Sequence, residues 1–287
     1  MQTLCDREFA SDIERPEYAI PLGITRGLDN AAYHGERSAV SSSQLKRMLV
    51  SPAHFKHGID TQPEEESSEA KLFGSVLHGR LLEPESFAER YFPMPKVDKR
   101  TVEGKALAAS LSQAAQGMTA FPEAWLAQID AMVGSARAHP KIAEILAQGE
   151  AEVALAWVDP ETGIRCKCKP DWWPGPHRVA DVKTALDISW EGFSRACAKY
   201  GYHLSAAMYV EGIEQVSGMR PDWSFIALEK EAPHCAAAYK ASEGFLARGR
   251  NDFRKALRML AHCRESGRYP GYQADGQWEL IDLPRWA

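Results

Sequence analysis

Residues 168–184 read CKPDWWPGPHRVADVKT, a stretch with the form of two strands joined by a tight turn at 174–176. If the turn is centred near Gly175, Asp171 and Asp181 face each other across the hairpin. Directly opposed residues of an antiparallel pair have Cβ atoms about 4.5–5.5 Å apart. Lys183 follows Asp181 at the second position and lies on the same strand face. The stretch therefore predicts two neighbouring carboxylates with a lysine beside them.

Two carboxylates this close repel each other, by about 4 kcal/mol at 4 Å and an effective dielectric constant of 20. A divalent cation between them would remove that repulsion, and oxygen ligands suit magnesium or manganese. Lys183 could then orient a water or stabilise negative charge developing on a phosphate. The alternative is a solvated face, with Ala180 and Val182 inward and Asp181 and Lys183 forming a surface pair.

Two residues elsewhere in the chain extend this candidate site. Glu152 begins the first of three expected strands and could add a carboxylate, although an exposed strand end is equally compatible with the pattern. His78 lies beside the apolar stripe of a helix that begins near residue 69. Its neutral imidazole could reach a metal, whereas a histidine in this position is more often a core or boundary residue.

The composition describes an ordinary globular chain of 287 residues, 45% hydrophobic and 25% charged, with a net charge of −5. It contains no apolar run long enough for a membrane span, and the acidic N-terminus does not have the form of a leader peptide. We therefore expect no membrane association and a cytoplasmic location. The six cysteines show no paired framework. The close pair Cys166 and Cys168 leaves open the hypothesis of a zinc protein anchored on these cysteines.

The hydrophobic pattern predicts an α/β fold in which a strand meander interrupts a series of helices. We expect residues 1–40 to be an arm with little structure of its own, residues 41–287 to form a single domain, and residues 61–69 to be an exposed loop. The expected strands are 152–158, 163–173, 177–184, 223–230 and 234–240. The expected helices begin near residues 41 and 69 and then span 104–117, 122–138, 140–148, 189–199, 203–216 and 241–266.

Taken together, the chain resembles the RecE-type (exonuclease VIII) branch of the PD-(D/E)xK nuclease superfamily, found mostly in phages and prophages. The resemblance runs in family order from about residue 38 to 272. The stretches that carry it are SSSQLKRMLVSPAHF, FGSVLHGRLLEPESF, EVALAWVDPETGIRCKCKPDWW, VADVKTALD, YGYHLSAAMYVEGI, FIALEKEAPHCAAAY and GRYPGY.

The resemblance implies a restriction-endonuclease-like core, with a mixed central sheet flanked by helices. It also implies a Mg²⁺-dependent exodeoxyribonuclease, with Mn²⁺ able to substitute, that degrades the 5′-ended strand of linear double-stranded DNA. The single-stranded 3′ tails would pass to a single-strand annealing protein for DNA recombination. Members of the family assemble as homo-oligomeric rings around DNA.

Carried over position by position, the resemblance makes His78, Asp171, Asp181 and the carbonyl of Val182 the metal ligands. It makes Lys183 the catalytic lysine, and we give Glu152 a supporting role. Tyr209 is retained in the catalytic set, but Ser205 stands where the family commonly has glutamine. This difference motivates a second hypothesis, a DNA-end-binding recombination protein with weak or no nuclease activity.

Basic and hydroxyl side chains around this site are candidate DNA contacts. Ser42, Ser43 and Lys46 open a helix whose N-terminal amides favour a phosphate, although a plain helix cap explains them as well. Lys167 and Lys169 alternate along a strand and share a face with Asp171, either as a cationic strip for a phosphodiester or as a solvated strand face. We also list Ser205 as a candidate DNA contact.

Overall fold

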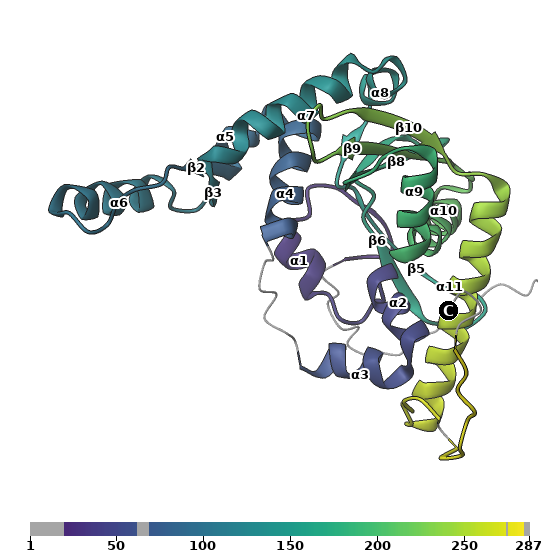
Figure 1. Ribbon diagram of the computed structural model, residues 1–287. Helices are drawn as coiled ribbons and strands as arrows, with labels where there is room; N and C mark the ends of the chain where they lie inside the picture. Colours follow the sequence, from purple (N-terminus) through teal and green to yellow (C-terminus); the bar gives the residue numbers. More distant parts are fainter. Residues whose placement is uncertain (1–19, 62–68, 274, 284–287) are drawn as a thin grey trace, which may run out of the picture.

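A five-stranded mixed sheet forms the centre of the protein in the computed structural model, which describes residues 20–61, 69–273 and 275–283 (Figure 1). The strand order is β10-β9-β8-β7-β4, in which β8 and β9 are parallel and the other pairs are antiparallel. The strands are β4 (Glu150–Ala151), β7 (Trp172–Gly175), β8 (Arg178–Ala185), β9 (Asp222–Glu229) and β10 (Ala236–Lys240). This arrangement confirms the expected mixed sheet.

A second, antiparallel sheet has the order β1-β5-β6. Its strands are β1 (Gly23–Thr25), β5 (Ala154–Val158) and β6 (Arg165–Cys168). The expected strand at 163–173 is therefore wrong as a single element, because it divides into β6 in one sheet and β7 in the other. Pro170 lies in the gap and has no N–H to continue a ladder. The segments β4–β5 and β6–β7 therefore form one long hairpin, which bends so that β5 and β6 lie in one sheet and β4 and β7 in the other.

Helices cover both faces of the five-stranded sheet, and side-chain alternation along β8 determines which residues face each layer (Figure 1). Ala180 and Val182 pack with α4 (Glu69–Leu82), α7 (Leu126–Ala138) and α8 (Pro140–Leu146). Val179 packs in the opposite layer. That layer contains α2 (Ser42–Val50), α3 (Pro52–Asp60), α9 (Trp190–Lys199), α10 (Tyr202–Ser217) and α11 (Glu243–Ser266). These helices agree with the expected ranges to within a few residues.

The segment before α2 is more ordered than we expected. Residues 23–25 form β1, and α1 (Asn30–Gly35) follows, with Ile20 and Tyr33 buried against Ala154 and Ala156. The expectation of an arm with little structure of its own is therefore wrong for residues 20–40, while residues 1–19 lie outside the described part of the chain. The expected loop at 61–69 falls mostly on residues 62–68, which are also outside it.

One extension projects from the body beside α4 and α7 (Figure 1). It comprises α5 (Phe87–Arg90), β2 (Tyr91–Met94), α6 (Val102–Ala114) and β3 (Thr119–Pro122), and it leads through the short helix Glu123–Trp125 into α7. The parallel pair β2–β3 was not expected from the sequence. Within the described ranges, none of the helices is both long and apolar enough to pass through a membrane.

Candidate metal centre and active site

The candidate site lies where the long hairpin bends between the two sheets. Glu152 stands between β4 and β5 in a left-handed conformation, with φ of 55°, and Asp171 stands just before β7. The backbone N–H of Glu152 donates to the carbonyl of Asp171 at 3.2 Å, which ties the two sides of the bend together. The acidic side chains of Glu152 and Asp171 lie close together at this bend.

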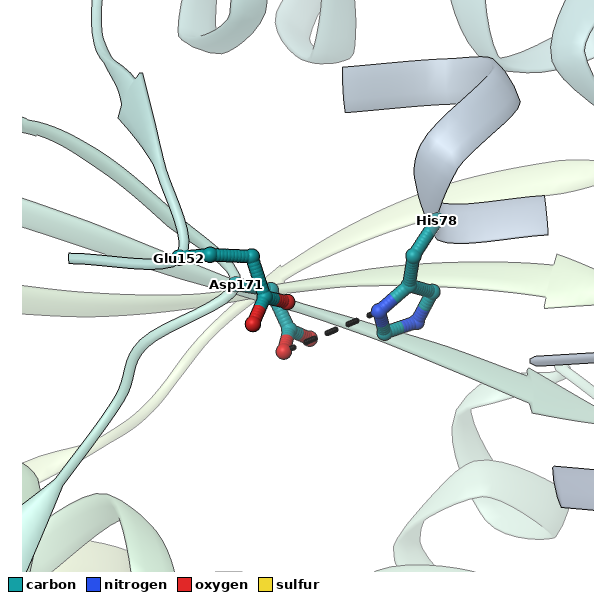
Figure 2. Close-up of side chains that lie close together, drawn as sticks. All are labelled: His78, Glu152 and Asp171. Carbon is teal, nitrogen blue, oxygen red and sulfur yellow. Dashed lines mark ion pairs between the residues drawn. The ribbon is translucent and has the colours of Figure 1, made fainter. Parts of the chain in front are cut away.

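His78 meets these carboxylates from helix α4 (Figure 2). Its Nδ1 lies 3.7 Å from Oδ1 of Asp171, and its ring also hydrogen-bonds to the backbone of Val182. The candidate ligand atoms of His78, Glu152 and Asp171 all lie within 4.8 Å of one another. Among the described residues this is the group close enough to hold a metal, and it contains no cysteine, which gives the zinc hypothesis no support.

The hairpin register brings Asp181 and Lys183 to the same place. Trp172 pairs with Ala180, so Asp171 and Asp181 meet as the next pair, and their carboxyl groups share a hydrogen bond. Asp171 Oδ2 also accepts from the N–H of Val182 at 2.7 Å. Lys183 Nζ lies 2.5 Å from Asp181 Oδ2 and 3.8 Å from Asp171 Oδ2. In this arrangement Asp181 is paired with Lys183, and Glu152 lies beside His78 and Asp171.

Burial and charge shift the pKa values of these groups. Burial and the neighbouring Asp181 raise the pKa of Asp171 to about 7, and burial and Asp171 raise the pKa of Glu152. Burial and Lys183 lower the pKa of His78, so its imidazole is neutral and available as a ligand. Burial alone would lower the pKa of Lys183, but Asp181 and Asp171 raise it above its usual value. The site therefore holds excess negative charge that a bound cation would neutralise.

The donor set fits a divalent cation. It combines carboxylate oxygens, which suit Mg²⁺ and Mn²⁺, with one neutral imidazole, a ligand that suits transition-metal ions. Burial and the neighbouring Asp181 raise the pKa of Asp171, and a bound cation would favour its ionised form. His78, Glu152 and Asp171 would hold the ion.

A second lysine approaches the site from α2. The ammonium of Lys46 lies 5.7 Å from the ring centroid of Tyr202, and burial together with Lys183 lowers its pKa to about 8. Ser42 is buried and accepts a hydrogen bond from Ser205 Oγ at 3.2 Å. Ser43 is exposed, and the helix is capped by Ser41 and Gln44. The structure thus brings Lys46 close to Lys183, and it brings Ser42 and Ser205 together.

The expected cationic strip of Lys167 and Lys169 is not present. Lys167 is 3% exposed, and its ammonium donates to the carbonyls of Tyr33 and Glu36 at 2.5 and 2.6 Å. Lys169 Nζ pairs with Glu152 at 2.5 Å and also contacts Asn30. Helix α1 covers both side chains, which the interpretation of residues 1–40 as an arm could not anticipate. Lys167 stabilises the N-terminal segment, and Lys169 balances Glu152.

Tyr209 lies deeper than an active-site tyrosine was expected to lie. Its ring meets Trp223 edge-on, with centroids 5.6 Å apart, and burial raises its pKa well above the usual value. Tyr209 is partly buried and packs against the core, and Asp181 and Asp171 also raise its pKa. Tyr202 was missed by the sequence reading, although its ring lies 5.4 Å from Lys183 Nζ. The available signal was its spacing, since Tyr202 stands about one helical turn before Ser205 on α10.

This fold and this cluster define a domain of the PD-(D/E)xK nuclease superfamily. A family model described as "PDDEXK-like domain of unknown function (DUF3799)" matches residues 41–282. The chain therefore belongs to that family. The crystal structure of a protein from Eubacterium rectale named "Putative exonuclease" is similar in fold, with a TM-score of 0.57 and 13% sequence identity over 87% of this chain and 91% of that one. Comparison with curated proteins yields no match.

Metal affinity should rise with pH because a cation must displace the proton of Asp171. With a pKa of about 7, the fraction of ionised Asp171 increases roughly tenfold between pH 6 and pH 8. We expect the Mn²⁺ association constant, measured by isothermal titration calorimetry, to rise by about the same factor. In Asp171→Asn, binding should be weak and the rise should be absent. A wild-type affinity that is flat over this range would contradict the assignment.

Asp171→Asn should also stabilise the metal-free protein. A raised pKa means that the carboxyl contributes stability fully below its unfolded value of 3.8, and this contribution is lost as pH rises through about 7. At pH 8 the substitution removes a buried negative charge while asparagine can still accept from Val182. We expect a gain of about 2 kcal/mol in the free energy of unfolding. Urea unfolding at pH 8 and pH 5 measures it, and an equal gain at both pH values would refute the charge explanation.

Proposed function

We propose that this protein is a metal-dependent exodeoxyribonuclease of the RecE type. It would degrade the 5′-ended strand of linear double-stranded DNA and leave 3′ single-stranded tails for recombination by strand annealing. The observation that carries the proposal is the convergence of His78, Glu152 and Asp171 within 4.8 Å, beside a lysine that is paired to two aspartates.

Each side chain has a defined part in this proposal. His78, Glu152 and Asp171 would hold a divalent cation, with Mg²⁺ preferred and Mn²⁺ able to substitute, and Asp181 and the Val182 carbonyl would be further ligands. The cation supplies charge neutralisation at the phosphodiester. Lys183 stays protonated between Asp171 and Asp181 and directs its ammonium at the water or the phosphate oxygen. Lys46 adds a second cation for the DNA backbone.

Labelled linear duplexes test the proposal directly. We expect Mg²⁺-dependent release of mononucleotides from the 5′-labelled strand, survival of the 3′-labelled strand as a single-stranded product, and no cleavage of a covalently closed circle. EDTA should abolish the reaction. Release from the 3′ end first, or cutting of the circle, would overturn the polarity or the exonuclease assignment.

A homo-oligomeric ring around the duplex and an annealing protein that receives the 3′ tail are further parts of this proposal. Sedimentation with and without duplex DNA tests the first. Copurification with a single-strand annealing protein tests the second. A monomer that releases its substrate after each cleavage would contradict the ring.

A second candidate function is DNA-end binding with weak or no cleavage. The observation that favours it is Ser205, whose hydroxyl donates to Ser42, so it is engaged on α2 rather than with the carboxylates. Under this alternative, duplex ends bind but remain intact in both Mg²⁺ and Mn²⁺. Ser205→Gln should then raise the cleavage rate.

A further inference from the structure

Two stacked tyrosine rings, Tyr202 and Tyr200, extend from Lys183 to the protein surface. Tyr202 is half-buried and lies beside Lys183, while Tyr200 stacks against it with centroids 5.7 Å apart and an interplanar angle of 27°. Tyr200 is 52% exposed. This tyrosine pair, Tyr200 and Tyr202, does not belong to the candidate metal centre.

The inner ring is fixed in place by the core. Tyr202 packs near Phe193 and Phe225, with centroid distances of 6.4 and 6.2 Å. The ammonium groups of Lys183 and Lys46 lie 5.4 and 5.7 Å from its centroid. Cations at this distance interact favourably with an aromatic ring. Tyr202 therefore connects the two lysines to the outer ring.

The backbone between Tyr200 and Tyr202 holds the exposed ring of Tyr200 against the half-buried ring of Tyr202. Gly201 has φ of +62°, a conformation that places the two tyrosines side by side at the start of α10. A Cβ at Gly201 would lie 3.3 Å from the side chain of Lys46, so this side chain packs against both the backbone of Gly201 and the ring of Tyr202. Lys199 adds a third ammonium, 5.3 Å from the centroid of Tyr200.

The chemistry of this surface selects its ligand. A flat aromatic ring can stack on another π system, while the ammonium groups of Lys46 and Lys199 beside the two rings attract negative charge. A nucleotide of single-stranded DNA combines both features, and stacking on an aromatic ring does not depend on which base is present. In a paired duplex the base faces are covered by neighbouring bases, so the tyrosine pair is suited to bind an unpaired nucleotide.

We propose that the exposed ring of Tyr200 is a stacking site for an unpaired nucleobase of the DNA strand at the active site, and that Lys199, whose ammonium lies over this ring, turns to contact the phosphate of that nucleotide. This inference rests on the proposed nuclease function and deepens it, because it assigns the surface that receives the melted strand. Tyr200 is a binding residue and takes no part in phosphodiester hydrolysis.

Equilibrium binding of a fluorescent twelve-residue thymidine strand in Ca²⁺ tests this site. We expect Tyr200→Ala to weaken binding about tenfold, because one base–aromatic stack is lost. Tyr200→Phe keeps the ring and should stay within about twofold of wild type. Tyr272→Ala is the matched control, because Tyr272 is 72% exposed and contacts His54. It should bind as wild type does.

An abasic strand of the same length separates stacking from every other effect. Wild type and Tyr200→Ala should bind the abasic strand equally, because there is no base to stack. A similar loss on both strands, or no loss on the thymidine strand, would overturn the inference. The thermal midpoint of Tyr200→Ala should match that of wild type, since the side chain is half exposed.

Duplex cleavage measured in parallel distinguishes the two levels of the proposal. If wild type degrades linear duplex DNA and Tyr200→Ala binds both strands as wild type does, the stacking site is wrong and the nuclease function stands. If wild type neither binds the single strand nor cleaves the duplex, both fail.

Discussion

Replacing Lys183 with alanine is expected to reduce the rate of duplex cleavage by about 10³-fold or more. The ammonium is paired with Asp181 at 2.5 Å and with Asp171 at 3.8 Å, and these carboxylates keep it protonated. Loss of one preorganised group that stabilises transition-state charge typically costs 10²–10³ in rate. Lys183 also helps to balance the carboxylates, so its removal adds to that loss. Initial rates of nucleotide release under saturating Mg²⁺ measure the effect.

The same variant should keep or increase its affinity for Mn²⁺. Removing the ammonium leaves the acidic groups less neutralised, and a cation then gains more by binding. Lys56→Ala is the control, because Lys56 forms an exposed pair with Asp60 on α3. That variant should cleave at the wild-type rate. If Lys183→Ala retained activity, or lost metal binding and activity together, the catalytic role given to Lys183 would be wrong.

Arg254→Ala is expected to destabilise the protein by about 3–5 kcal/mol, because it leaves buried carboxylates unpaired. Arg254 on α11 contacts Asp159, which is 0% exposed, and Glu211, which is 8% exposed. These contacts fasten α11 to α10 and to the turn that follows β5. A loss of this size corresponds to a fall of about 10 °C in the unfolding midpoint. Calorimetric or urea unfolding would measure it.

Arg258, one turn further along α11, provides the matched control. It pairs with Glu161, and the two side chains are 63% and 43% exposed. An exposed pair contributes about 1 kcal/mol or less, so Arg258→Ala should shift the midpoint by only a few degrees. Equal destabilisation by the two substitutions would show that burial of the carboxylates is not the cause.

The local hairpin could be predicted from the sequence because its parts are close along the chain. A Pro-Gly-Pro turn and the period-two alternation of β8 specify a register, and that register brings Asp171 opposite Asp181 with Lys183 beside them. Helices α4, α9, α10 and α11 were predicted for the same reason, since each apolar stripe repeats within its own segment.

Features that join distant segments could not be predicted in this way. Periodicity does not show that one hairpin serves two sheets, so the bend that turns Glu152 toward His78 was not foreseen. Alternation placed Lys167 on a face but could not show that α1 covers that face.

The sequence by itself determined the paired carboxylates and the lysine beside them, because a turn and a two-residue period are local properties of the chain. Tertiary structure alone decided which third group joins the metal centre, and it alone brought Lys46 from α2 to the rings of Tyr200 and Tyr202. The physical reason is that packing between elements is specified by the whole core, and no single segment contains that information.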